Sequence, residues 1–365
     1  MTNQDLIYTL ALQRAPNIGD ITAKKLIRSF GSAGAVLKAS PAKLSAIEGI
    51  GKSRVKDLQN SHLIKLAEEE LQFIQENDIA VSYFEDTDYP QHLKNCIDAP
   101  LLLFKRGNIN LENKRIISIV GTRKATNQGI AFCQELIKEL AFLNPVIVSG
   151  FAYGIDIAAH KAATENQLQT IACMAHGLNQ IYPKVHNKYV RQVEDNGGFM
   201  TDFWSNATFD RNNFLRRNRI VAGISEATIV VESAAKGGSL VTADIANSYN
   251  REVFAVPGRL TDQMSKGCNH LIKTHQARLL SGIEDLVYQL NWDIEDKPKP
   301  QPTLFVAFTE EEQIIYDKLK DLGKAEIDQL ALACEMPTFK LNPILLNLEL
   351  KGVLRPLPGK LFEVI

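Results

Sequence analysis

The stretch RIISIVGTRKATNQG, residues 115–129, contains the strand and the turn from which the fold can be worked out. A β-rich run ends at Gly121, and Thr122, Arg123 and a segment suited to begin a helix follow it. A turn of this kind can hold a phosphate on backbone N–H groups at a helix N-terminus. We therefore expect Gly121 and Thr122 to cradle a phosphate and the Arg123 guanidinium to clamp it.

Similar apolar runs recur on both sides of this stretch, from about Val81 onward, with helix-length segments between most of them. The runs are AVSYF (80–84), PLLLFKRG (100–107), NPVIVSG (144–150), QTIACMAHG (169–177), GFMTDF (198–203), ATIVVES (227–233) and REVFAVPG (251–258). Alternation of this kind predicts a parallel sheet covered by helices on both faces. We expect an α/β core over residues 76–291, a doubly wound parallel sheet with its ligand crevice at the carboxyl ends of the strands.

The segments on either side of this core differ from it in pattern. Residues 1–75 are expected to form short helices, and PNIGDITAKKLI (16–27) and EGIGKSRVKDL (48–58) both have the pattern of a helix-hairpin-helix. Residues 292–304 are rich in proline and charge and predict a linker. Residues 305–365 then indicate three helices and an apolar hairpin, the order of a winged helix.

The composition gives no sign of a nucleic-acid partner, because 41 Lys and Arg residues are balanced by 42 Asp and Glu residues. Any basic surface must therefore be local. The five cysteines are scattered, so neither a disulfide framework nor a metal site is expected. The first residues lack the pattern of a signal peptide, and no apolar run reaches the length of a membrane span. We expect a cytoplasmic protein with no membrane partner.

Glycines and cations gather where the strands of the core are expected to end. Gly150 permits a close approach of chain to ligand, and the arginines around Asn218 favour anion binding. Tyr182 offers a face for stacking a base. The segment KGGSLVTAD (236–244) predicts a second backbone cradle at a helix start. The residues of this expected crevice are Gly121, Thr122, Arg123, Gly150, Tyr182, Lys184, Arg217, Asn218, Arg219, Gly237, Gly238 and Ser239.

Several enzyme classes lack support in the sequence. A GxGxxG turn with an acid about 20 residues further on is absent, as is a GxxxxGK[ST] run. No His, Asp and Glu cluster suggests metal hydrolysis. Asp156 is expected to cap or support a helix start, and His160 shares its helix face, so we interpret them as structural. The crevice is expected to bind rather than catalyse, without a cofactor.

Taken together and in this order, the motifs resemble the DNA-processing protein A (DprA/Smf) family. They are VGTR (120–123), VSGFAYGIDIAAHKAA (148–163), GLNQIYPKVHN (177–187), RRNRIVAG (216–223), VVESAAKGGSLVTA (230–243), REVFAVPG (251–258) and KGCNHLIKTHQARLL (266–280). The resemblance implies an extended Rossmann-like core with an N-terminal helix-hairpin-helix (SAM-like) domain and a C-terminal winged helix. It also implies a protein, not an enzyme, that binds and protects single-stranded DNA and loads RecA recombinase during natural transformation.

The resemblance also assigns roles to residues. Arg123 and Lys184 would contact the DNA backbone, Arg217 and Arg219 would line the same pocket, and residues 237–239 would help to form it. A homodimer would use residues 254–273, and the residues that we expect at its interface are Met264 and Leu271. Two positions depart from the family pattern, namely Ala175 in place of a glycine and Leu215 in place of a proline. Neither change removes a cation.

Two alternatives stay open from the sequence. The core also resembles nucleotide-binding phosphoribohydrolases, in which Asp244 or Glu232 would supply the acid. An adaptor role through the C-terminal module is the other. From Glu310 to the end the chain has 10 acidic and 7 basic residues, a net charge of −3. Because a helix that enters the DNA major groove should be cationic, this module favours a protein contact or a weak duplex contact.

Overall fold

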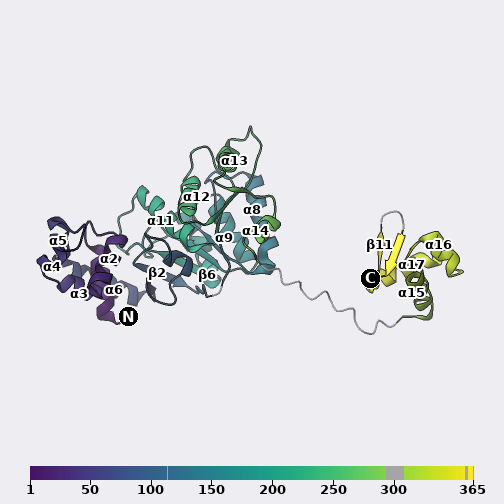
Figure 1. Ribbon diagram of the computed structural model, residues 1–365, viewed down its shortest axis with the longest axis horizontal. Helices are drawn as coiled ribbons and strands as arrows, with labels where there is room; N and C mark the ends of the chain where they lie inside the picture. The colour runs from purple at the N-terminus through teal and green to yellow at the C-terminus, as the bar shows by residue number, and fades with distance from the viewer. Residues whose placement is uncertain (113, 293–307, 358–360, 365) are drawn as a thin grey trace. The chain divides into compact units, whose positions relative to one another are not determined.

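The computed structural model describes residues 1–112, 114–292, 308–357 and 361–364, and the chain divides into two compact units, Met1–Trp292 and Asp293–Ile365 (Figure 1). The expected linker lies outside the described residues except for Trp292. That residue is buried, and its indole N–H donates to Glu226 at 3.0 Å. None of the described helices is long and apolar enough to cross a membrane.

The first unit begins with a group of helices, coloured purple in Figure 1. They are α1 (Asn3–Arg14), α2 (Asp20–Phe30), α3 (Ala33–Lys38), α4 (Pro41–Ser45), α5 (Lys52–Leu58) and α6 (His62–Glu76). Helix α1 packs on α6 and α3. Helices α2 and α5 both begin after an N-cap glycine, Gly19 and Gly51, as the two expected hairpins require.

A nine-stranded sheet follows, in the order β1-β2-β6-β5-β4-β3-β7-β8-β9. Its strands are β1 (Ala80–Tyr83), β2 (Leu102–Gly107), β3 (Ile116–Val120), β4 (Val146–Ser149), β5 (Thr170–Cys173), β6 (Gly197–Thr201), β7 (Ala227–Val230), β8 (Glu252–Ala255) and β9 (Arg278–Leu279). The pairs β1–β2 and β2–β6 are antiparallel, and all the others are parallel.

Helices cover both faces of the sheet. They are α7 (Gln91–Lys94), α8 (Asn127–Leu140), α9 (Ile155–Glu165), α10 (Val190–Asp195), α11 (Arg211–Ile224), α12 (Gly238–Ser248), α13 (Lys266–Lys273) and α14 (Ile283–Gln289). Residues Ile117 and Ile119 of β3 pack with α8, α9 and α14, whereas Val120 packs in the cluster that includes α11 and α12. The chain moves from β3 to β4 in one direction and later adds β7 on the other side of β3. This doubly wound order confirms the predicted fold and places the topological switch point between β3 and β7.

The helical segment is held to the core by a buried charge cluster. The Arg219 side chain, from α11, donates to Asp202 and to Asp20 at the start of α2. The second oxygen of Asp20 accepts the N–H of Leu101 at 2.8 Å. Nearby, the Glu70 carboxylate of α6 accepts the backbone N–H of Ser205 at 2.8 Å. The Asp20 carboxylate, in the first turn of α2, is thus engaged in contacts within the protein.

The second unit has the expected helices and hairpin of a winged helix. Its elements are α15 (Glu310–Leu322), β10 (Lys324–Glu326), α16 (Ile327–Ala333), α17 (Thr338–Leu350), β11 (Leu354–Leu357) and β12 (Leu361–Val364). Strand β12 lies between β10 and β11 and is antiparallel to both. Ile315, Leu330 and Leu345 belong to a core of its own.

Arg219→Ala should lower the free energy of unfolding by about 3–5 kcal/mol, because it leaves Asp202 and Asp20 buried without their cation. Urea denaturation checks this. Arg191→Ala is the matched control, since Arg191 is 93% exposed and lies 3.9 Å from Asp195, and it should change stability by less than about 0.5 kcal/mol. Equal effects of the two substitutions would contradict a stabilising role for this buried charge cluster.

Candidate nucleic-acid interface

A cavity of about 850 Å³ opens at the carboxyl ends of the parallel strands, beside the switch point. It is lined by the turns after β3, β4 and β7 and by the first turns of α11 and α12. Among the described residues that line it, Asp156 is the only carboxylate. Its cations are Arg123, Arg211, Arg217 and Lys236. Four cations against one acid give this cavity the local positive charge that the near-neutral chain as a whole lacks.

The turn after β3 is shaped by packing within the protein more than by a ligand. The N–H of Thr122 donates to the Glu232 carbonyl at 2.7 Å and so continues the pairing of β3 with β7. A Cβ at Gly121 would lie 2.5 Å from a side-chain carbon of Ile155. The expectation that Gly121 and Thr122 cradle a phosphate is therefore corrected. Gly121 makes room for α9, and the Thr122 N–H is already hydrogen-bonded to the Glu232 carbonyl.

Arg123 projects from this turn beside a group of aromatic rings. Its guanidinium carbon lies 5.3 Å from the ring centroid of Phe214. The centroids of Tyr182 and Phe209 are 4.9 Å apart, and that of Phe214 lies 5.6 Å from Phe209. Tyr182 and Phe209 are 40% and 46% exposed. Exposed rings beside a cation are what a single strand needs, because bases stack on the rings and the phosphate pairs with the cation.

Arg217 is the buried cation of the cavity. It is 5% exposed, and its guanidinium donates to the Cys173 carbonyl. A Cβ at Gly150 would lie 2.3 Å from its Nη1, so the glycine makes room for the arginine. Burial lowers the Arg217 pKa, which the Asp156 carboxylate opposes; burial likewise raises the Asp156 pKa, which Arg217 opposes. Each group therefore favours the charged form of the other, against the effect of burial.

The start of α12 forms the other side of the cavity. Gly237 is the N-cap and provides no side-chain hydrogen bond, and Gly238 has open space where a Cβ would be. The Ser239 hydroxyl is buried and donates to the Ser233 hydroxyl at 3.0 Å. Asn218 donates to the Gly238 carbonyl at 3.4 Å and joins α11 to this start. An uncapped N-terminus of an eleven-residue helix attracts anions.

Two of the expected residues do not line this cavity. Lys184 is exposed at the start of the short helix η2 (Lys184–Tyr189), and its DNA contact stays a prediction. The expectation that Arg219 lines the same pocket as Arg217 is corrected, because Arg219 does not border the cavity. Successive residues on an α-helix are turned by about 100°, so Arg219 leaves α11 on a different side from Arg217. It binds Asp20 and Asp202 instead.

The expected dimer contacts are also corrected in part. Leu271 is 2% exposed and packs in the core of the first unit, because it shares the inner face of α13 with Cys268. Met264 is partly exposed, and its sulfur accepts the Thr122 hydroxyl at 3.6 Å. Leu260 is the residue of this segment with the largest apolar exposure, 87%.

Among the lining residues that the sequence interpretation did not assign to the site, those with an aromatic ring or a positive charge are Phe209, Arg211, Phe214 and Lys236. Phe209, Arg211 and Phe214 lie just before the arginine motif, in TFDRNNFLRR, where aromatic and basic residues alternate. That spacing was the available signal. Of the two departures from the family pattern, Leu215 lines the cavity and Ala175 is buried away from it.

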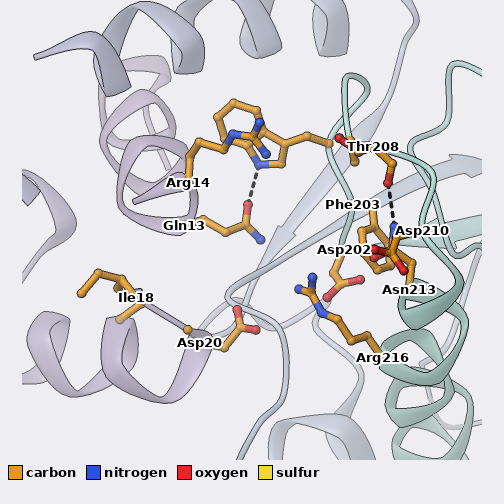
Figure 2. Close-up of a pocket in the computed structure, with 14 residues that line it drawn as sticks. Gln13, Arg14, Ile18, Asp20, Asp202, Phe203, Thr208, Asp210, Asn213 and Arg216 are labelled. Carbon is orange, nitrogen blue, oxygen red and sulfur yellow. Dashed lines mark hydrogen bonds between the residues drawn. The ribbon is translucent and has the colours of Figure 1, made fainter. Parts of the chain in front are cut away.

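A smaller cavity of about 320 Å³ lies on the other side of α11, between that helix and helices α1 and α2 (Figure 2). Figure 2 shows Arg216 pointing toward Asp202, with Gln13 and Arg14 on the facing helix. Arg14 and Arg216 are balanced by Asp20, Asp202 and Asp210. The local charge therefore does not favour a phosphate.

The acids of the enzyme alternative do not enter the main cavity. Glu232 accepts the backbone N–H of Thr126 at 2.9 Å and also its hydroxyl, and so supports the start of α8. Asp244 is exposed on α12 and does not line the cavity. In the described part of the chain, no group of three His, Cys, Asp or Glu residues could hold a metal ion.

Comparison with known proteins shows which family this chain resembles in sequence. The family model of DNA recombination-mediator protein A matches residues 80–291, that of the DprA winged helix domain matches 295–360, and that of the SAM-like helix-hairpin-helix tandem matches 9–61. A putative DNA processing protein DprA of Mycobacterium tuberculosis is 35% identical over 264 residues, 71% of this chain and 67% of that protein. DprA of Bacillus subtilis is 37% identical over 203 residues, 55% and 68% of the two chains.

Solved structures agree with these matches. DprA from Streptococcus pneumoniae superposes with a TM-score of 0.65 at 30% identity, covering 79% of this chain and 98% of that one. DprA from Helicobacter pylori, whose structure describes a single-stranded DNA binding mode, gives a TM-score of 0.52 at 30% identity, covering 58% and 95%. The fold is that of a Rossmann-like DNA-processing protein. The chain belongs to the DprA/Smf family.

His160 supports the fold rather than chemistry. Its Nδ1 hydrogen-bonds to the Thr170 hydroxyl at 2.7 Å, and Asp156 instead accepts the N–H of Ala152 at 3.3 Å. Burial lowers the His160 pKa from 6.5 to about 3, and the Arg217 charge adds to this effect. His160 is therefore neutral in the folded protein near neutral pH.

A pH dependence of stability follows. Above pH 6.5 the His160 imidazole is neutral in both states and contributes nothing; below it, only the unfolded chain takes up the proton, so stability falls until about pH 3. His160→Gln should remove up to about 1.4 kcal/mol per pH unit from the slope of unfolding free energy. Urea denaturation of both proteins at several pH values measures it, and parallel slopes would contradict the assignment.

Proposed function

We propose that the 850 Å³ cavity binds single-stranded DNA, and that the protein protects incoming strands and loads RecA recombinase onto them during natural transformation, in the cytoplasm. One observation carries the DNA assignment. Arg123 lies against Phe214, beside Phe209 and Tyr182, so a cation and exposed rings share one cavity. This combination suits a strand held by stacking and phosphate contacts without base reading.

The roles of other residues belong to the same proposal. Gly237, Gly238 and Ser239 would hold a phosphate at the start of α12, and Lys184 would extend the path of the strand along η2. The printed description of the Helicobacter pylori relative, with its single-stranded DNA binding mode, supports this ligand class. A homodimer formed through residues 254–273 is part of the proposal, with Met264 and Leu260 as its exposed apolar residues.

The winged helix fits a protein partner better than duplex DNA. Its net charge is −3 from Glu310 onward. On α17, Phe339, Leu346 and Leu350 are 72%, 55% and 79% exposed. Lys351, which follows this helix, pairs with Glu312 at 2.5 Å. We therefore propose that this unit contributes an apolar contact rather than a phosphate clamp.

Arg123→Ala should weaken binding of all single-stranded sequences alike and flatten the salt dependence, since each lost phosphate contact reduces the slope by about 0.7. Phe214→Ala should cost about 1–3 kcal/mol for each base that it stacks. A salt titration of fluorescent single-stranded and double-stranded oligonucleotides measures both. Arg191→Ala, an exposed cation on α10, is the control and should behave as wild type. Unchanged affinity and slope in Arg123→Ala would contradict the proposed site.

The same geometry predicts no hydrolysis of nucleotides. Asp156, the one acid among the described lining residues, accepts the N–H of Ala152 and lies in the electrostatic field of Arg217. Purified protein incubated with nucleoside monophosphates should release no free base by chromatography. Release that disappears in Asp156→Asn or Asp244→Asn would overturn the non-enzymatic proposal.

A further inference from the structure

A second positively charged cavity, of about 600 Å³, lies away from the crevice described above, between α2 and the segment 84–97 that leads into β2. Its charged lining residues are Lys24, Lys25, Arg28, Lys94 and Glu85. Four cations thus face one acid. The 320 Å³ cavity, which also borders α2, has no such excess of cations.

The four cations are poorly neutralised within the protein. Lys25 pairs with Glu48 at 3.4 Å, but that carboxylate is 96% exposed, so the pair contributes little. Lys94 donates to the Glu85 carbonyl at 3.3 Å. Arg28 is exposed and has no hydrogen-bond or ion-pair partner among the described residues. The cavity therefore keeps most of its positive charge.

Lys24 is the most informative of the four. It is only 6% exposed, yet among the described residues its ammonium has no hydrogen-bond acceptor and lies 5.2 Å from the Phe84 ring centroid. Burial lowers its pKa to about 8; Asp20 opposes this shift, and the charges of Arg219 and Arg28 add to it. The Arg219 side chain is 11% exposed and, unlike Lys24, has two carboxylate partners. The ammonium nitrogen is not fully enclosed, so an anion in the cavity can reach it and would offset the cost of its partial desolvation.

We propose that this cavity binds a backbone phosphate of DNA, as a second anchor for a strand whose other part occupies the crevice at the sheet. That the ligand is DNA rests on the proposed function. That the cavity binds an anion rests only on its lining cations and on Lys24. Lysines bind phosphate as point charges and read no base, so the anchor would be independent of sequence. Helix α2 belongs to the same compact unit as the crevice, so the two sites are carried by one body.

The first experiment tests the anion site alone. Inorganic phosphate, compared with chloride at equal ionic strength, should raise the melting temperature of the wild-type protein more than that of Lys24→Met, in which the start of α12 can still bind phosphate. Methionine keeps a long apolar side chain and removes the unpaired charge, so the variant should fold at least as stably without phosphate. Equal stabilisation of the two proteins by phosphate would overturn the site.

The second experiment tests the DNA ligand, with a short oligonucleotide that fills only the crevice and a strand several times longer. Lys24→Met and the double variant Arg28→Ala/Lys94→Ala should weaken binding of the long strand. The slope of its affinity against salt concentration should fall by about 0.7 for each lost contact. Neither should change the short one. The double variant replaces two exposed side chains, so it also covers the case in which Lys24→Met fails to fold.

The outcomes separate the two proposals. Arg123→Ala should weaken binding of both the short and the long strand, and Arg191→Ala should change neither. Long-strand binding that both cavity variants leave unchanged would overturn the second anchor while the crevice stands. Wild-type protein that binds no single strand would overturn the proposed function and the DNA anchor together, and the phosphate experiment would still decide on the anion site. Competition by an acidic peptide but not by DNA would replace the nucleic acid with a protein partner.

Discussion

The register of helix α11 is the constraint on which much of the first unit depends. Because each residue turns the helix by about 100°, Arg216 and Arg219, which are three residues apart, leave it on neighbouring sides, and Arg217 leaves it on another. Arg216 faces the small cavity, Arg217 lies under the floor of the main one, and Arg219 holds the helical segment through Asp20 and Asp202. A shift of one residue in this helix would therefore alter the cavity and the docking of the N-terminal helices together.

The glycines of the crevice illustrate how a ligand-binding motif can be determined by packing. Gly150 is required because the Arg217 guanidinium occupies the space of its Cβ, and Gly121 is required by Ile155. Both keep the crevice in shape without touching what binds there. Gly238, by contrast, has open space at this position and lies at a helix start without a side-chain cap, so no packing within the protein requires a glycine there. A glycine-rich sequence alone does not distinguish these two uses.

The sequence predicts the fold and the place of the site because both follow from patterns local to the chain. Strand runs, glycine turns and helix starts placed Arg123, Gly238 and Ser239 correctly at one edge of the sheet. The positions of Arg219 and Leu271 were wrong because they depend on which face of a helix meets a distant segment. Pairing of residues as far apart as 20 and 219 is set by tertiary packing, which no local pattern encodes.

Cations with and without internal partners have different effects in this chain. A chain of net charge −1 can bind a polyanion only if some of its cations lack internal partners. Arg219 forms ion pairs with two acids, Asp20 and Asp202, and so stabilises the fold. Arg123 has an aromatic ring beside it, and Lys24 is buried without an acceptor among the described residues. Because uncompensated positive charge costs stability in the free protein, its persistence at two cavities would be accounted for if each bound a phosphate, as proposed.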